Sequence, residues 1–368
     1  MLAALDAVLD GRSSPLLPVP AGDLRQSDAL TTALRVGEEI GDDVALVVPT
    51  SGTTGTPKGA MLSAPALIAS ATATYDHLGG PGTWLLALPS YHIAGIQVLV
   101  RSALAGTVPA ELDVSAGFDT AALPAAVASM GSGRRYGSLV PAQLAKALAD
   151  APAATALAEL DAVLLGGGPA PVAILEGAAA AGISVVRTYG MSETSGGCIY
   201  DGRPLNGVQV RIDEADRNRV VLGGTTLANG YRNPPTPDPF AEPGWFRTDD
   251  IGALDDSGVL HILGRVDDAI STGGLTVLPQ PVEAVLARHP AIADCAVFGV
   301  PDDRLGQRVV AAVVVRAGAA MPSLADLRAH VAESLAVTAA PREVHAVDEL
   351  PRLGIGKLDR RALIARFS

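Results

Sequence analysis

Short apolar runs alternate with helix-like stretches between about residue 44 and residue 200 of the chain. The run VALVV (44–48) is short and rich in valine, as buried strands are, whereas IAGIQVLVRSAL (93–104) is long enough to predict a helix. The same reasoning predicts strands at WLLAL (84–88), GSLV (137–140), AVLLGG (162–167) and ISVVRTYG (183–190), and helices at 65–77, at 142–150 and from Pro171. Repeated strand–helix–strand units predict an α/β fold with a mainly parallel sheet and helices on both faces.

The pattern changes after Tyr200. The segments GVQVRI, RVVLG, TTLANGYR and GVLHILG are short and separated by Gly, Pro and Asp, which predicts a small antiparallel β subdomain over about 201–263. Within it, NPPTPDPF (233–240) predicts a loop.

A compact α+β unit is predicted after GRVDDAISTGG (264–274). VLPQPVEAVLARH predicts a helix, CAVFGV and QRVVAAVVV predict strands, and SLADLRAHVAESL predicts an amphipathic helix that Ser323 opens with Asp326 three positions later. We therefore expect a large N-terminal domain over 1–266 and a smaller C-terminal domain over 267–368.

The composition is typical of a globular protein with a sizeable core, since 48% of the residues are hydrophobic. The formal net charge of −12 argues against nucleic acid or an anionic membrane as the main partner, so local cations and backbone N–H groups would have to hold any anionic substrate. Cys198 and Cys295 suit neither a disulfide framework nor a zinc site. The N-terminus lacks a basic start and no apolar run is long enough to span a membrane, so a cytoplasmic protein is expected.

Residues 49–62, PTSGTTGTPKGAML, surround one lysine, Lys58, with glycines and hydroxyl groups. The hydroxyl groups belong to Thr50, Ser51, Thr53, Thr54 and Thr56, and the glycines that would let the backbone approach a ligand are Gly52, Gly55 and Gly59. The loop departs from the Walker A pattern, since Pro57 replaces its second glycine and Gly59 its metal-binding hydroxyl residue. A strand before the loop and a helix after it favour phosphate binding; a surface loop without a ligand is the alternative.

Five motifs in order along the chain resemble those of the adenylate-forming superfamily, which includes acyl-CoA synthetases, adenylation domains and luciferases. The segment from Thr50 to Gly59 resembles its phosphate loop. The other motifs are YGMSET (189–194), GWFRTDD (244–250), the hinge motif GRVDD (264–268) and the catalytic-lysine motif GIGKLDRRAL (354–363). This resemblance covers almost the whole chain and implies a two-domain architecture with a small mobile α+β lid at the C-terminus.

The resemblance implies a two-step ligase, in which a carboxylate attacks the α-phosphate of ATP, releasing pyrophosphate, and a thiol then displaces AMP. Lys58 and the loop would hold the β- and γ-phosphates, Glu193 would bind Mg²⁺, and Lys357 would bridge the substrate carboxylate and the α-phosphate. The other implied nucleotide contacts are Gly167, Gly168, Tyr189, Gly190, Met191, Ser192 in place of the usual Thr, Asp250 at the ribose hydroxyls, and Arg265 at ribose and phosphate.

Each of these residues has a structural alternative when it is taken singly. Asp250 could be a turn or cap residue, Arg265 could form a surface ion pair, and Glu193 and Lys357 could be solvated charges. Their joint occurrence with the phosphate loop favours catalysis over a non-catalytic nucleotide-binding relative, which is the alternative from a different class. The departures from Walker A count against a P-loop kinase.

The resemblance also implies that the small domain alternates between two poses, one for adenylation and one for the reaction with the thiol, and this gives roles to further residues. Asp267 matches the hinge, and the loop around Gly273 and Gly274 would face coenzyme A in the second pose. This sequence has GGLTV where relatives often have Gly-Gly-Glu-Asn.

Four stretches between the motifs resemble the 2-succinylbenzoate–CoA ligases of menaquinone biosynthesis, namely 88–106, 138–144, 164–171 and 189–208. The resemblance places His92 near the reacting carboxylate and Gly166 at the acyl pocket. Arg101 and Arg187 are candidates for binding the second carboxylate of such a substrate. A structural role is the alternative for His92 and for both arginines.

Coenzyme A is the expected acyl acceptor, because the chain ends eleven residues after Lys357 and no carrier attachment site follows the lid. The expected partners are ATP with Mg²⁺, an aromatic carboxylic acid and coenzyme A, and a homodimer is possible. Another acyl-CoA ligase, or a freestanding enzyme that loads a separate carrier, is the alternative within the superfamily.

Overall fold

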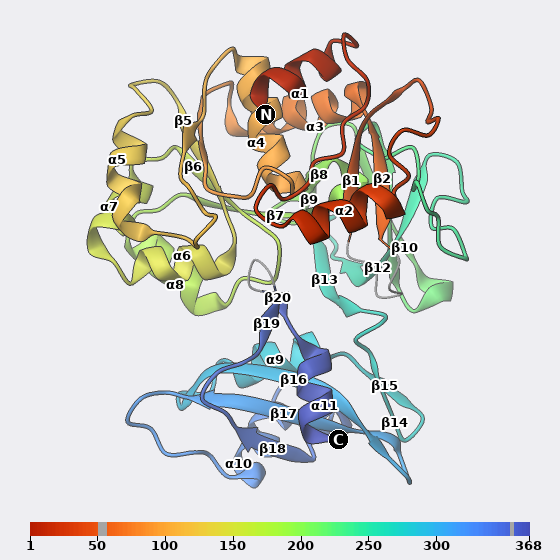
Figure 1. Cartoon of the computed structure of the whole chain (residues 1–368). Helices are drawn as coiled ribbons and strands as arrows, with labels where there is room; N and C mark the ends of the chain where they lie inside the picture. The colour runs from red at the N-terminus through yellow and green to blue at the C-terminus, as the bar shows by residue number, and fades with distance from the viewer. Residues whose placement is uncertain (51–56, 354–356) are drawn as a thin grey trace. The chain divides into compact units, whose positions relative to one another are not determined.

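The computed structural model describes residues 1–50, 57–353 and 357–368, and the chain divides into two compact units. Unit 1 comprises Met1–Arg211 and Val221–Arg247, and unit 2 comprises Ile212–Val220 and Thr248–Ser368 (Figure 1). The predicted α/β class, with a large N-terminal part and a smaller C-terminal part, is confirmed. We predicted that the C-terminal domain begins at residue 267 and moves as a lid. That boundary stays a prediction.

A seven-stranded sheet organises unit 1, in the order β4–β3–β5–β6–β7–β8–β9. Its first four pairings are parallel and its last two are antiparallel, so the mainly parallel sheet is confirmed. The strands are β3 (Thr83–Leu86), β4 (Ala110–Glu111), β5 (Arg135–Leu139), β6 (Ala162–Leu165), β7 (Val185–Met191), β8 (Gly196–Tyr200) and β9 (Arg203–Pro204).

Helices cover both faces of this sheet (Figure 1). Alternate residues of a strand point to opposite faces, so Trp84 of β3 packs with α1, α3 and α4, whereas Leu85 packs with α5 to α8. Both side chains are fully buried, and each such burial stabilises the fold by about 2 kcal/mol. The helices are α1 (Leu2–Leu9), α3 (Ala64–Leu78), α4 (Ile93–Ala105), α5 (Leu123–Ala128), α6 (Pro141–Leu148), α7 (Ala151–Ala158) and α8 (Val172–Ala180).

The glycine-rich loop connects two antiparallel strands, β1 (Val44–Thr50) and β2 (Lys58–Ser63), which follow α2 (Leu24–Ala33). Helix α3 begins only after β2, with Ser63 as its N-cap. The helix predicted over 65–77 is confirmed as α3, but the strand β2 that precedes it was not predicted. Among the described residues, no helix begins directly after the glycines, as a phosphate-binding strand–loop–helix junction would require. Residues 58–63 lack β-branched side chains; they form a strand because β1 pairs with them and Ala60 and Leu62 are buried in the core.

TTLANGYR (225–232), which is described throughout, does not form the predicted strand; Tyr231 makes a single bridge with Ala60. The neighbouring strands form a four-stranded sheet in the order β10–β11–β12–β13, and the division between the two units falls within it. They are β10 (Val208–Asp213), β11 (Arg219–Gly224), β12 (Trp245–Leu254) and β13 (Leu260–Arg265). The length of β12, which carries the GWFRTDD motif, was not predicted.

The α+β character of unit 2 is confirmed by a sheet in the order β15–β14–β17–β16, with β18 paired to β17. The capping box of Ser323 and Asp326 opens α10 as predicted. The elements are β14 (Ile270–Thr272), β15 (Leu275–Val277), α9 (Pro279–Leu286), β16 (Ile292–Asp302), β17 (Gly306–Val315), α10 (Leu324–Ala332), β18 (Glu343–Ala346), β19 (Arg352–Leu353), β20 (Lys357–Leu358) and α11 (Arg360–Phe367).

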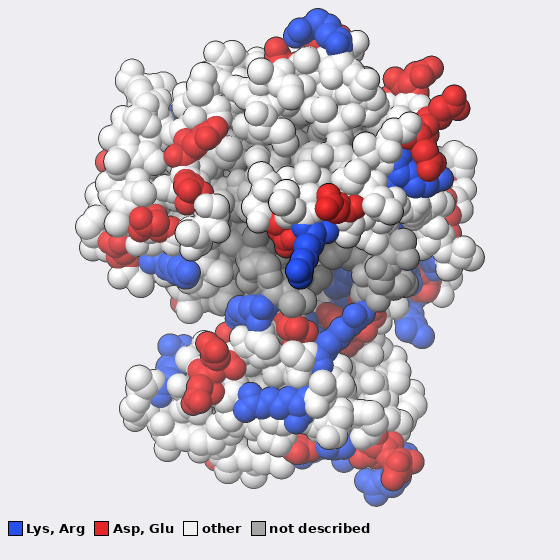
Figure 2. Space-filling view, viewed as in Figure 1, with Lys and Arg blue, Asp and Glu red and all other residues white. Residues whose placement is uncertain are grey.

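The surface carries charges of both signs. Figure 2 shows acidic and basic side chains interspersed among uncharged residues, without a continuous basic face in that view. Among the described residues, no helix is long and apolar enough to cross a membrane.

Candidate active site

Lys58 occupies the first position of β2, beside the glycine-rich loop. It is paired with Thr50, the last residue of β1, whose hydroxyl donates to the Lys58 carbonyl oxygen over 3.4 Å. The Lys58 Nζ atom lies 4.9 Å from the centroid of the Tyr231 ring, which is a cation–π distance. The phosphate contacts predicted for Ser51, Gly52, Thr53, Thr54 and Gly55 concern residues outside the described part of the chain and stay predictions.

Gly59 is required by packing. A Cβ atom at this position would lie 2.5 Å from Cγ1 of Val47 and 3.0 Å from Cδ2 of Leu34. Close contact with β1, and not only the approach of a ligand, therefore explains the glycine that follows Lys58.

Glu193 lies on the one-turn 3-10 helix η2 (Ser192–Thr194), between β7 and β8. The Thr194 hydroxyl accepts the Met191 N–H over 2.9 Å and lies 2.7 Å from the Gly196 carbonyl oxygen, which closes this turn. Glu193 is 7% exposed, and its Oε1 accepts a 2.5 Å hydrogen bond from the Tyr231 hydroxyl. A buried carboxylate needs such donors, because burial alone disfavours its charged form.

The predicted nucleotide residues Tyr189, Gly190 and Met191 form the end of β7, and Ser192 begins η2. A Cβ atom at Gly190 would lie 2.1 Å from the Gly196 carbonyl oxygen, so the pairing with β8 requires this glycine. Its nucleotide contact stays a prediction.

The predicted glycines after β6 have different environments. A Cβ atom at Gly166 would lie 2.4 Å from the Thr188 hydroxyl oxygen, so Gly166 is needed for packing against β7. Gly167 has a φ of +82°, which favours glycine. A Cβ atom at Gly168 would meet open space. Only Gly168 is therefore left without a structural reason for its small size.

His92 is the residue before α4 and keeps an exposed edge, with its ring 4.6 Å from that of Tyr91. Partial burial lowers the pKa of His92 below its ordinary value. The imidazole is therefore neutral near pH 7, which suits a residue beside an anionic carboxylate as a hydrogen-bonding group.

The lowered pKa of His92 predicts a pH effect on stability. Below about pH 6.5 the unfolded chain takes up a proton at this residue that the folded chain does not, so stability falls as pH falls through that window. We expect His92→Gln to lose less stability than the wild type between about pH 7.5 and about pH 5.5. Thermal unfolding at both pH values checks this, and equal losses in the two proteins would contradict the lowered pKa.

The two candidate arginines for a second carboxylate have other contacts. Arg101 is 3% exposed in the core of unit 1, with its guanidinium 4.7 Å from the Trp84 ring and 3.5 Å from the Tyr200 hydroxyl. Burial lowers the pKa of Arg101. Arg187 is largely exposed and forms a 2.9 Å ion pair with Asp201. The core contacts of Arg101 and the ion pair of Arg187 agree with the structural role that was the alternative for each. Binding of a substrate carboxylate stays a prediction for both arginines.

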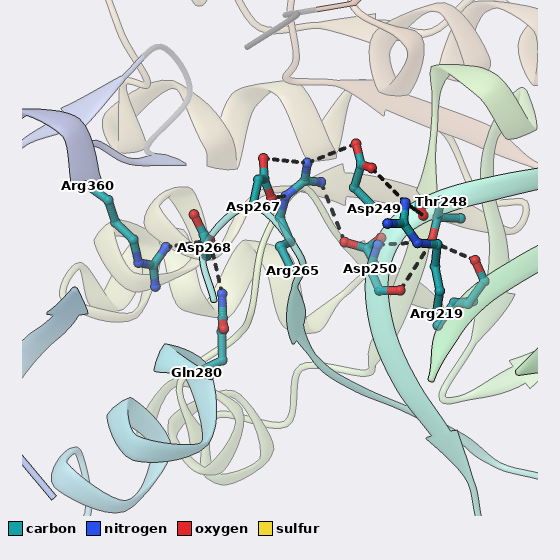
Figure 3. Close-up of polar contacts among 10 residues, drawn as sticks. Arg219, Thr248, Asp249, Asp250, Arg265, Asp267, Asp268, Gln280 and Arg360 are labelled. Atoms are coloured by element: carbon teal, nitrogen blue, oxygen red, sulfur yellow. Dashed lines mark hydrogen bonds and ion pairs between the residues drawn. The ribbon is translucent and has the colours of Figure 1, made fainter. Parts of the chain in front are cut away.

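Asp250 and Arg265 are paired across β12 and β13 of unit 2. Arg265 points toward a row of carboxylates, at 3.5 Å from Asp250 and 3.6 Å from Asp249, and forms two hydrogen bonds of 2.9 and 3.1 Å with Asp267 (Figure 3). Although burial disfavours its charged form, Asp267, Asp250 and Asp249 together raise the pKa of Arg265. The sequence motifs thus bring together the residues predicted for the ribose and for the hinge.

Asp268, next to the predicted hinge residue Asp267, points to a different partner. Its carboxylate accepts hydrogen bonds of 3.2 Å from both Gln280 and Arg360 (Figure 3). Arg360 begins α11, which follows β20, so an ion pair connects the segment after Lys357 to the hinge motif. This contact was not predicted from the sequence.

The predicted coenzyme A loop is a tight turn between β14 and β15. Gly273 and Gly274 have φ values of +58° and +80°, and Thr272 pairs with Leu275 on either side of them. Two positive φ values in a two-residue hairpin loop favour glycine at both positions. The turn geometry therefore explains the two glycines, and their contact with coenzyme A stays a prediction.

Lys357 is the first residue of β20, and its backbone pairs with that of Leu353 in β19. Helix α11 follows immediately, with the Asp359 carboxylate capping the N–H of Ala362. The predicted catalytic position is thus the end of a short hairpin in unit 2.

Both cysteines are free thiols, as predicted. Burial raises the pKa of Cys198 to about 12 and raises the pKa of Cys295 as well. Neither thiol is therefore a nucleophile near pH 7. The described residues contain no group of three or more His, Cys, Asp or Glu side chains that could hold a metal ion.

The AMP-binding enzyme family matches residues 9–231, and the AMP-binding enzyme C-terminal domain matches residues 281–357. The chain is 67% identical over 370 residues to a probable 2-succinylbenzoate–CoA ligase of Mycobacterium tuberculosis, with coverage of 100% of this chain and 95% of that relative.

Solved structures are similar as well. An o-succinylbenzoate CoA synthetase from Bacillus subtilis, in complex with the acyl-adenylate intermediate OSB-AMP, is 28% identical with a TM-score of 0.74, covering 87% of this chain and 69% of that chain. A structure of that synthetase with ATP and magnesium ion has 28% identity and a TM-score of 0.74, covering 89% of this chain and 72% of that chain. The chain belongs to the AMP-binding enzyme family.

Proposed function

We propose that this protein joins 2-succinylbenzoate to coenzyme A in two steps. The carboxylate first attacks the α-phosphorus of ATP, and the bond to pyrophosphate breaks. The thiol of coenzyme A then attacks the acyl carbon, and AMP leaves. The observation that carries this proposal is the 67% identity, over the whole chain, to a probable ligase of that substrate.

In unit 1, Lys58 and the buried Glu193 supply a cation and a carboxylate for the nucleotide. Lys58, Thr50 and the loop would hold the β- and γ-phosphates, as the sequence motif predicts. Glu193 would hold Mg²⁺, since this ion is commonly bound by one or two carboxylates together with substrate phosphates and water. The single buried carboxylate at η2 fits that mode, and the bound ion would neutralise charge on the phosphates.

The acid would bind near His92, whose neutral imidazole can donate or accept a hydrogen bond without adding charge. Gly166 to Gly168 would offer backbone groups to the adenine and the acyl group. Arg101 and Arg187 remain the candidates for the second carboxylate. Of the two, Arg187 is the accessible one, because its side chain is 58% exposed and its partner Asp201 is 45% exposed.

In unit 2, Asp250 would accept hydrogen bonds from the ribose hydroxyls, and Arg265 would support ribose and phosphate. Lys357 would stabilise the charge on the α-phosphate during the first step. Rotation at Asp267 would then withdraw Lys357 and present the turn at Gly273 and Gly274 to coenzyme A.

The proposed substrate is tested by ATP–pyrophosphate exchange across a panel of carboxylic acids. We expect 2-succinylbenzoate to support exchange at least tenfold better, as a ratio of kcat/KM, than benzoate or a fatty acid, because only it offers a second carboxylate, for which Arg187 or Arg101 would be the partner. Formation of the thioester with coenzyme A then checks the second step.

The outcomes separate the alternatives. Exchange with 2-succinylbenzoate no better than with benzoate would contradict this substrate and favour another acyl-CoA ligase. Exchange without thioester formation would favour an enzyme that loads a carrier. A chain that supports no exchange with any acid would be a non-catalytic nucleotide-binding relative.

A further inference from the structure

The side chain of Tyr231 contacts two charged residues that come from distant parts of the sequence. Its hydroxyl donates to Glu193 Oε1 over 2.5 Å, and its ring lies 4.9 Å from Lys58 Nζ. Tyr231 is 6% exposed and packs edge-on against Phe240, with ring centroids 5.3 Å apart. The ring is therefore confined between the two charges that are expected to meet the phosphates and the metal.

The backbone on either side of Tyr231 is hydrogen-bonded to Glu193 and to Gly59, the neighbour of Lys58. The N–H of Ala228 donates to the Glu193 carbonyl oxygen over 2.9 Å, and the N–H of Arg232 donates to the Gly59 carbonyl oxygen, beside Lys58, over 2.8 Å.

The side chain of the next residue, Arg232, provides a third anchor. The Arg232 guanidinium donates to the carbonyl oxygens of Leu34 and Arg35 over 3.3 and 3.2 Å. Backbone hydrogen bonds and this anchor therefore set the position of Tyr231 independently of its two side-chain contacts.

We propose that Tyr231 is a positioning residue, which holds the Lys58 ammonium and the Glu193 carboxylate ready for ATP and Mg²⁺; this rests on the proposed function. Opposite charges attract strongly away from water, and a direct pair would leave neither group available to a ligand. Tyr231 gives each charge a neutral partner instead: a hydroxyl donor for the carboxylate and an aromatic face for the ammonium.

The test separates the two halves of the side chain. Tyr231→Phe removes the hydroxyl and keeps the ring, whereas Tyr231→Leu removes both. Calorimetric titration of the full chain with ATP, without acid or coenzyme A, is repeated over a range of Mg²⁺ concentrations. Thermal unfolding of each variant is measured separately.

We expect Tyr231→Phe to raise the Mg²⁺ concentration for half-maximal ATP binding about tenfold, because the carboxylate loses a hydrogen bond to its charged form. Its ATP affinity without Mg²⁺ should stay within about twofold of the wild type, since the ring still faces Lys58. Tyr231→Leu should in addition weaken Mg²⁺-free binding about threefold. In a Glu193→Gln background, Tyr231→Phe should change the Mg²⁺ dependence no further.

Tyr136→Phe is the matched control. Tyr136 also lies in unit 1 and is 0% exposed. Its hydroxyl donates to the Gly80 carbonyl oxygen over 3.0 Å. Loss of this hydroxyl should lower stability and leave the Mg²⁺ dependence of ATP binding at the wild-type value.

Two results would overturn the proposal. A Tyr231→Phe variant with the Mg²⁺ dependence of the wild type, or a shift of equal size in Tyr136→Phe, would make Tyr231 merely structural while leaving the proposed function intact. A wild-type chain that binds no ATP at any Mg²⁺ concentration would overturn both this inference and the proposed function.

Discussion

Replacing Lys357 with alanine is expected to abolish adenylation and to leave thioester formation from preformed adenylate largely intact. Charge gathers on the α-phosphate in the transition state of the first step only, and an ammonium placed there stabilises that state. Removing one such group typically costs about 10²–10³-fold in rate. ATP–pyrophosphate exchange measures the first step, and release of AMP from synthetic acyl-adenylate with coenzyme A measures the second.

Lys146 provides the control for this experiment. The chain contains three lysines, and Lys146, exposed on α6, is the one that lies in none of the five motifs. Lys146→Ala should retain both half-reactions. An equal loss of both half-reactions in Lys357→Ala would mean that this lysine is not confined to the first step.

Replacing Arg360 with alanine is expected to destabilise unit 2 by about 1–3 kcal/mol, because it leaves partly buried carboxylates without their cation. Arg360 lies 2.6 Å from Glu283 and 3.2 Å from Asp268, and it donates to the Val297 carbonyl oxygen over 3.2 Å. The side chains of Arg360 and Glu283 are 17% and 16% exposed, so water cannot replace the lost partner well.

The loss of stability caused by Arg360→Ala should depend on pH. Burial already raises the pKa of Glu283, with Arg360 opposing that shift. Without the arginine the pKa of Glu283 rises further, and the folded state then binds its proton more tightly than the unfolded state does. The deficit should therefore be largest near neutral pH and shrink as pH falls toward the pKa of Glu283.

The measurement has to report on unit 2. Both tryptophans, Trp84 and Trp245, lie in unit 1, so hydrogen exchange of the amides in β16 and β17 is the suitable probe. Arg352→Ala is the matched control, because Arg352 forms a 2.6 Å ion pair with Asp294 in which the side chains are 43% and 41% exposed. Exposed pairs are worth less than about 1 kcal/mol. A loss in Arg360→Ala no greater than in Arg352→Ala would contradict a structural role for the partly buried contacts of Arg360.

Two residues whose roles were not predicted, Tyr231 and Arg360, contact residues of the predicted motifs. Tyr231 contacts Lys58 and Glu193, which stand 135 positions apart in the sequence, and Arg360 connects the segment after Lys357 to Asp268 of the hinge motif. A tyrosine in TTLANGYR and an arginine in a basic helix carry no local pattern that marks such roles. Only their partners in space identify them.

The sequence by itself determined the elements whose side chains repeat with a regular period, and the motifs whose chemistry is local. Strand β6 and helix α4 were predicted from their apolar runs. A strand that is buried on both faces needs a continuous apolar run, and a helix that packs on the sheet needs apolar residues along its packed face. The glycine-rich loop and the lysine motif indicated ATP chemistry through their resemblance to the adenylate-forming superfamily.

The tertiary structure alone decided the features that depend on a distant partner. Strand β2 exists because β1 pairs with it. Residues 225–232 are irregular because their backbone hydrogen bonds are divided among Gly207, Glu193 of η2, and Gly59 and Met61 of β2, so they form no continuous ladder with one strand. Gly59 and Gly190 are glycines because other chain segments leave no room for a Cβ atom. The physical reason is the same in each case. A hydrogen bond or a packing contact needs two partners, and where the second partner is distant in the sequence, the local pattern does not reveal it.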